Sequence, residues 1–205
     1  MPGRLSRPLL PSLLGLLTIA LFYLAFSSTP ASAKMTSARD ADAAAAAAGP
    51  LSHLRVSLHQ SSTSPATIVA RVTNDDPSTA YTLVAWDTPL DPLAIKLGLA
   101  TLTLPSTGEV LSLPIIQIRR KLPPDAASII TIEPGKSAEQ EFVLEEPVVP
   151  VERIRAEGGG RVSVQFKGWW ASVWAVEGGE PVAKEGPDEA RLSGEFASEV
   201  LEVTV

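Results

Sequence analysis

The chain has 205 residues and a formal net charge of −6 at pH 7, and it contains no cysteine and only two histidines. The absence of thiols excludes disulfide frameworks, zinc–thiolate sites and cysteine nucleophiles. The negative charge repels phosphate backbones, so the composition argues against nucleic acid as a partner.

A basic start, an apolar stretch and small residues make up the N-terminus. Arg4 and Arg7 precede the apolar stretch Leu9–Phe26, and Ala31-Ser32-Ala33 follows. This order is typical of a secretory signal peptide over residues 1–33, and it predicts a secreted protein. The alternative is an uncleaved signal anchor, since the stretch is at the lower edge of the ~17–25 residues that span a bilayer. Such a single-pass protein would meet the membrane only through Leu9–Phe26.

Residues 34–50 differ from the rest of the chain in their alanine content. Ala43–Ala48 form an unbroken run, which Gly49-Pro50 ends. Alanine favours helix, but an isolated segment this short is marginal in water. We therefore predict a flexible linker between the N-terminal segment and the domain.

Residues 51–205 contain short alternating apolar and polar runs separated by turn residues. Leu54, Val56 and Leu58 alternate with polar residues, which is the two-residue period of a half-buried strand. The same signals predict further strands over 68–72, 81–86, 99–104, 110–113, 116–120, 129–132, 139–144, 161–176, 192–196 and 200–205. Asp91–Gly98 is predicted as a single helical turn. The pattern predicts an all-β fold, namely an immunoglobulin-like antiparallel β-sandwich.

The strand predicted over residues 161–176 contains three of the four tryptophans. Side chains alternate between the faces of a strand, so Trp170 and Trp174 are expected in the core, and Trp169 is expected on the solvent face with Lys167. An exposed tryptophan is a candidate contact residue. Two structural alternatives stay open, namely a bulge at Gly168 that exchanges the faces and a loop that covers Trp169.

The polar residues do not form a recognisable catalytic or metal-binding pattern. His53 and His59 have no accompanying His-Glu-x-x-His motif, and no Gly-x-Ser-x-Gly motif occurs. The acidic groups at 74–76 and 87–91 suit either turns or a calcium site. The basic run Arg119-Arg120-Lys121 suits either a solvated loop or a dibasic processing site. We predict no catalytic, cofactor-binding or metal-binding residue, and hence no enzyme.

The order of turns and strands from about residue 54 to 144 resembles the propeptide domain of fungal deuterolysin-type zinc metallopeptidases. The matching segments are Val69–Asn74 with its acidic turn, Trp86–Asp91, Ile116–Arg120, and Ile132–Ser137 leading into Glu139–Leu144. The resemblance implies a β-sandwich that binds a secreted protease as a chaperone or inhibitor. The zinc motif of those enzymes is absent, so no catalytic residue carries over.

These observations predict a non-enzymatic β-sandwich of the secretory pathway that binds another protein. The alternative is a membrane-anchored structural domain without a dedicated ligand. The predicted contact residues are Trp86, Asp87, Thr88, Pro89, Leu90, Asp91 and Trp169.

Overall fold

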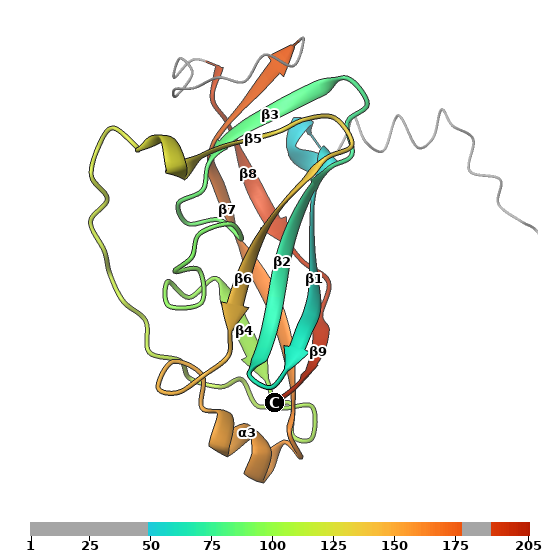
Figure 1. Cartoon of the computed structure of the whole chain (residues 1–205), viewed down its shortest axis with the longest axis vertical. Helices are drawn as coiled ribbons and strands as arrows, with labels where there is room; N and C mark the ends of the chain where they lie inside the picture. The colour runs from blue at the N-terminus through green and yellow to red at the C-terminus, as the bar shows by residue number, and fades with distance from the viewer. Residues whose placement is uncertain (1–48, 178–189) are drawn as a thin grey trace, which may run out of the picture. The chain divides into compact units, whose positions relative to one another are not determined.

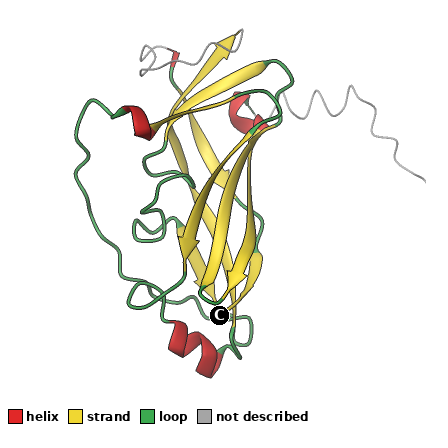
Figure 2. Cartoon of the chain, in the orientation of Figure 1, coloured by secondary structure: helices red, strands yellow, loops and turns green. Residues whose placement is uncertain are grey.

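A computed structural model describes residues 49–177 and 190–205, which form two antiparallel sheets (Figure 1). The all-β prediction is confirmed, since strands make up most of the regular secondary structure in the described residues (Figure 2). The predicted signal segment lies outside the described residues, as does the predicted linker except for Gly49 and Pro50. Within the described part of the chain, none of the helices is long and apolar enough to cross a membrane.

The smaller sheet contains strands β1 (Leu54–Thr63), β2 (Ala66–Asn74) and β6 (Ser137–Val143) in the order β1-β2-β6. All pairs are antiparallel, and the register places Val56 opposite Val72 and Ile68 opposite Phe142. These four side chains are buried, whereas Glu139 and Glu141 on β6 are exposed. One face of this sheet therefore packs on the core, and the other is largely exposed, apart from Thr67 and Val69 of the central strand β2.

The larger sheet is organised around the long strand β7 (Arg161–Glu177). Its partners are β3 (Thr79–Val84), β4 (Ala100–Thr103), β8 (Leu192–Ala197) and β9 (Leu201–Thr204), and β5 (Ile129–Ile132) pairs with β3. Ser163 is opposite both Thr103 of β4 and Glu202 of β9, so these two strands flank β7. Residues 85–99, called the excursion below, connect β3 to β4. The excursion contains the predicted contact segment 86–91.

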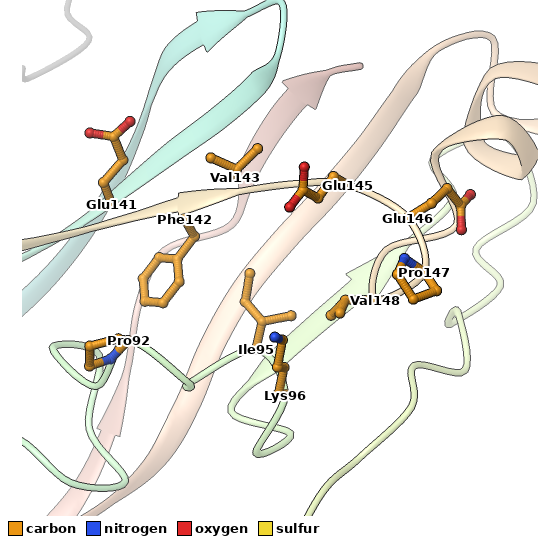
Figure 3. A pocket seen from close by; sticks show the side chains of 10 residues that line it. All are labelled: Pro92, Ile95, Lys96, Glu141, Phe142, Val143, Glu145, Glu146, Pro147 and Val148. Carbon is orange, nitrogen blue, oxygen red and sulfur yellow. The ribbon is translucent and has the colours of Figure 1, made fainter.

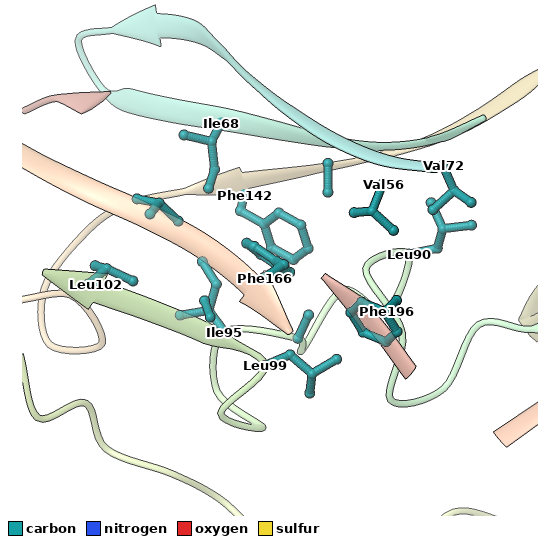
Figure 4. Packing of buried hydrophobic residues seen from close by; sticks show 14 of the residues in the cluster. Val56, Ile68, Val72, Leu90, Ile95, Leu99, Leu102, Phe142, Phe166 and Phe196 are labelled. Carbon is teal, nitrogen blue, oxygen red and sulfur yellow. The ribbon is translucent and has the colours of Figure 1, made fainter. Parts of the chain in front are cut away.

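The core fills the space between the two sheets (Figure 4). Phe142 of β6 and Phe166 of β7 meet there, with ring centroids 5.4 Å apart. Trp170 packs against Phe196 of β8 in the same way, at 4.8 Å. A side chain the size of Trp or Phe contributes about 3–5 kcal/mol when its full removal is measured, so these aromatic pairs dominate the packing energy.

Three short helical segments complete the described structure: η1 (Pro50–His53), η2 (Ala126–Ser128) and α3 (Val151–Glu157). The sequence did not predict α3, which buries only Val151 and Ile154 and is too short for a clear 3.6-residue period. It ends at Gly158, where a Cβ would lie 2.7 Å from the Arg161 carbonyl oxygen. The segment predicted as a helical turn, 91–98, is a series of turns that includes one helical hydrogen bond, from the Leu97 N–H to the Leu93 carbonyl at 2.9 Å.

Two predicted strands are absent from the sheets. Among the described residues, 116–120 have no strand partner, and 110–113 contribute only an isolated bridge between Val110 and Thr103. Pro114 and Pro123 flank the first of these segments, and a proline has no N–H to donate to a neighbouring strand. Both segments have the alternating apolar residues of a strand, but neither forms a strand of the described sheets.

Candidate protein-binding surface

The predicted contact segment 86–91 lies mostly in the interior. Thr88, Leu90 and Asp91 are at most 3% exposed, and Pro89 is buried as well. Asp87 is exposed and has a left-handed φ of 57°, and Trp86 is half-buried. Four of the six residues therefore have little surface to offer a partner, and this part of the predicted site reduces to Trp86 and Asp87.

Hydrogen bonds within the segment explain why these residues are buried. The Thr88 hydroxyl donates to the Ala85 carbonyl at 2.7 Å and accepts from the Leu90 N–H at 3.1 Å. The Asp91 carboxylate accepts from the N–H groups of Asp87 and Leu93, both at 2.9 Å. Asp and Thr side chains of this kind shape turns by bonding to nearby backbone. Their role here is to fold the excursion between β3 and β4.

Arg120 joins this segment to the chain that follows β4. Its Nη2 donates to Asp91 Oδ2, and its guanidinium carbon lies 5.5 Å from the centroid of the Trp86 ring. The Trp86 indole N–H in turn donates to the Ser128 hydroxyl at 3.0 Å. The basic run was predicted as a solvated loop or processing site, and Arg119 and Lys121 are indeed exposed, but the Arg120 side chain is only 25% exposed.

Trp169 lies on the outer face of the larger sheet and is 52% exposed, whereas Trp170 and Trp174 are buried. The predicted faces of these three tryptophans are therefore confirmed, although the alternation is interrupted between Trp170 and Val173, where the register with β8 shifts and Val173 is buried. The register with β8 is regular from Lys167 to Trp170, so no bulge at Gly168 exchanges the faces. Gly168 has another role, since a Cβ there would lie 2.7 Å from the Phe196 ring.

Residues 113–122, called the arm below, form a surface that the sequence did not single out. Four of the eight exposed large hydrophobic residues in the described chain lie in it: Ile115, Ile116, Ile118 and Leu122, with exposed fractions of 67%, 39%, 38% and 74%. Figure 1 shows the arm as the long yellow-green trace between β4 and η2. The flanking prolines are the feature of the sequence that could have predicted this surface. A proline has no N–H to donate, so an apolar run between two prolines is less able to pair with a strand of the sheet.

The arm is held to the rest of the domain at a few points. Its backbone bond is from the Ile116 N–H to the Lys96 carbonyl, at 2.9 Å. Ile115 lies beside Gly98, and Arg120 binds Asp91. The remaining N–H and C=O groups of the arm have no hydrogen bond to the described residues. An extended segment with free backbone groups and exposed apolar side chains is suited to pairing with another chain.

A hollow of about 270 Å³ lies between β6 and the excursion (Figure 3). Ile95, Phe142 and Val148 are among its apolar lining residues, and Glu141 and Glu145 are among its carboxylates. Ligand pockets usually have roughly 300–1,000 Å³, so this hollow is at the lower limit for a small molecule.

The acidic turn after β2 has structural partners. Asp75 pairs with Arg55 at 2.8 Å, and Asp76 lies 4.0 Å from His53 Nε2. Burial raises the pKa of Asp76, but hydrogen bonds from Ser78 and Thr79 outweigh it, so the pKa lies below its ordinary value. In the described residues no three His, Cys, Asp or Glu side chains are grouped as metal ligands, and calcium stays an untested alternative.

Comparison with known proteins gives one family and one relative. A family model described as an immunoglobulin-like domain matches residues 53–205. A protein of Arthroderma benhamiae, named "Uncharacterized secreted protein", is 32% identical over 142 residues, which cover 68% of this chain and 69% of that protein. No solved structure matches the chain.

Proposed function

The chain belongs to the family of immunoglobulin-like domains, and from this premise we propose that it is a secreted, non-enzymatic β-sandwich that binds another protein. Secretion is supported by the apolar N-terminal segment and by the name of the fungal relative. A mature N-terminus at Lys34 is the expected result of sequencing the secreted protein. An N-terminus at Met1 would favour the membrane-anchored alternative.

The observation that carries the binding proposal is the arm. Soluble proteins seldom expose several large apolar side chains close together unless another molecule covers them. Ten residues of extended chain reach about 33 Å, which is long enough for a partner strand to pair along its length. Trp169 and Asp87 are additional contact residues in the proposal, because both are exposed.

The buried polar residues support the non-enzymatic part of the proposal. The Asn74 amide donates to the carbonyls of Thr79 and Ile132, and the Ser198 hydroxyl accepts from the Phe166 N–H. Thr82 shares a hydrogen bond with Thr131 across two strands. These groups hold the fold together. A hydrolase screen of the purified protein tests this part, and turnover that follows the protein through purification would overturn it.

The partner that we propose is a secreted protease, which the domain binds in the manner of a propeptide. The support is the resemblance of the turns to protease propeptides, and two of the matching segments are neighbours in space. Asn74 at the end of β2 bonds through its backbone to Gly135 and Lys136, at 2.9 and 3.0 Å. The acidic turn and the Pro134-Gly135 turn therefore form one end of the smaller sheet.

Capture of secretory-pathway proteins on the immobilised full chain tests the binding proposal. The variant Ile118→Ser with Leu122→Ser removes apolar surface from the arm, and it should lose the captured partner. The matched control is Val200→Ser, because Val200 is 61% exposed and lies outside the arm. If the control and the arm variant retain the same proteins in equal amounts, the arm is not the binding surface.

A further inference from the structure

The basic run Arg119-Arg120-Lys121 lies in a part of the chain that is open to another protein's active site. From Leu111 to Lys121 the chain has no helix, turn or sharp bend. From residue 114 to 121 the backbone makes one hydrogen bond to another described residue, from the Ile116 N–H to the Lys96 carbonyl. Endoproteinases bind their substrates as extended strands through backbone groups, so a segment with free N–H and C=O groups is a preferred site of cleavage.

We infer that the arm is a proteolytic processing site for a serine endoproteinase that has a carboxylate in its primary specificity pocket. The bonds cleaved are Arg119–Arg120 and Lys121–Leu122. Water is added across the peptide bond, which leaves a carboxylate on the basic residue and an amino group on the residue after it. The reaction requires no oxidant, reductant or cofactor, and the basic side chain fills the acidic pocket.

The structure makes the bond after Arg120, Arg120–Lys121, less accessible to a protease than these two bonds. Successive side chains of an extended segment point to opposite sides, so Arg119 and Lys121 lie opposite Arg120. Arg119 and Lys121 are exposed, whereas Arg120 is bound to Asp91 and lies over the Trp86 ring. A protease that takes Arg119 or Lys121 can leave this contact intact. Cleavage after Arg120 requires that the contact first be broken.

Cleavage in the arm would leave the sandwich in one piece. On one side, Leu111 is buried and donates its N–H to the Leu102 carbonyl of β4. On the other side, Pro124 is buried, and Asp125 caps η2 by accepting from the Ser128 N–H and hydroxyl. Both product chains remain paired in the larger sheet. Processing therefore alters the arm, which is the surface of the proposed binding function. The cleavage itself does not depend on whether the arm binds a partner.

Limited digestion of the full chain with trypsin, followed by mass spectrometry of the fragments, tests the inference. The first cuts within the described residues should follow Arg119 and Lys121. The cut after Arg120 should be slower by on the order of tenfold to a hundredfold, because a hydrogen-bonded ion pair must open first. Arg55 and Arg71 are internal controls, since their side chains are 59% and 45% exposed but lie on strands β1 and β2. Neither should be cut on this timescale.

Two variants complete the test. Arg119→Gln with Lys121→Gln changes only exposed side chains, and the arm should then survive digestion at least tenfold longer. Asp91→Asn releases Arg120, so the bond after it should be cut about as fast as its neighbours, while Arg55 and Arg71 stay intact if the domain remains folded. First cuts outside the arm, equal rates at the three bonds in the unmodified protein, or unchanged digestion of the double variant would each overturn the inference. Failure to capture a partner would not affect any of these results.

Discussion

Replacement of Asp91 by alanine should cost a large part of the stability of the domain. The Asp91 side chain is 1% exposed and accepts from the N–H groups of Asp87 and Leu93 as well as from Arg120. A buried donor that loses its acceptor costs about 1–3 kcal/mol, and the loss of one partner of a buried ion pair costs about 3–5 kcal/mol. Arg120 is one-quarter exposed, so solvent partly screens its charge. We expect a loss of about 3–5 kcal/mol in the free energy of unfolding.

Urea unfolding followed by tryptophan fluorescence measures this loss. In a thermal scan the same change lowers Tm by about 6–20 °C, since each kcal/mol is worth about 2–4 °C in a domain of this size. Asp91→Asn keeps one carbonyl oxygen for the turn and should lose only about 1–3 kcal/mol. The difference between the two variants separates the turn contribution from the charge contribution.

A double-mutant cycle with Arg120→Met isolates the ion pair. The coupling energy between Asp91→Ala and Arg120→Met should be about 1–3 kcal/mol, because the two side chains share one buried contact. The matched control is the pair Arg153 and Glu109, whose side chains are 39% and 49% exposed. Exposed pairs of this kind are worth about 0–1 kcal/mol. A coupling at Asp91 no larger than the control, or a loss below about 1 kcal/mol for Asp91→Ala, would refute the reasoning.

Three further predictions follow from the strands and turns. Trp170→Ala should cost about 3–5 kcal/mol and Trp169→Ala less than about 0.5 kcal/mol in urea unfolding, because only the first is buried; equal losses would contradict the assigned faces. Gly168→Ala should cost about 1–3 kcal/mol, since its Cβ would lie 2.7 Å from the Phe196 ring, and a neutral result would mean that the ring moves freely. Asp76 has a lowered pKa, so the stability from its ionised form is present above the unfolded value of 3.8 and is lost as the pH falls through the folded value. The variant Asp76→Asn should therefore lose less stability between about pH 5 and pH 2 than the unmodified protein, and an identical pH profile would contradict this assignment.

Strand β7 shows why a strand is predicted well when burial differs between its two faces. In β7 the even-numbered residues Val162, Val164 and Phe166 are buried, and the odd-numbered Lys167 and Trp169 are exposed. A shift of one residue would exchange these faces, so the sequence specifies the orientation of the strand strongly. The same period could not show that β3 and β4 pair with successive parts of β7, because strand order depends on contacts between distant residues.

The predicted contact segment shows a second limit of prediction from the sequence, which concerns burial. Asp87 and Asp91 have the same side chain, yet one is exposed and the other is fully buried. Local sequence identifies both as turn formers, because each can bond to nearby backbone. Arg120, twenty-nine residues after Asp91, supplies the counterion of the buried carboxylate, and the local sequence does not show this contact. The basic run predicted a solvated surface, and its middle residue is the counterion of a buried carboxylate.

The arm shows why an apolar period alone does not define a strand. Ile116 and Ile118 have the spacing of a strand, but they are 39% and 38% exposed, and the backbone between them has no partner among the described residues. A paired strand requires a second chain segment whose N–H and C=O groups face it. Pro114 and Pro123 lack an N–H, so they limit the length over which the arm can pair with such a segment. The arm therefore keeps the side-chain pattern of a strand, but apart from the bond from Ile116 to Lys96 its backbone groups make no hydrogen bonds within the described structure. A partner chain or a protease active site can supply those bonds, and digestion of the arm and capture through it distinguish the two.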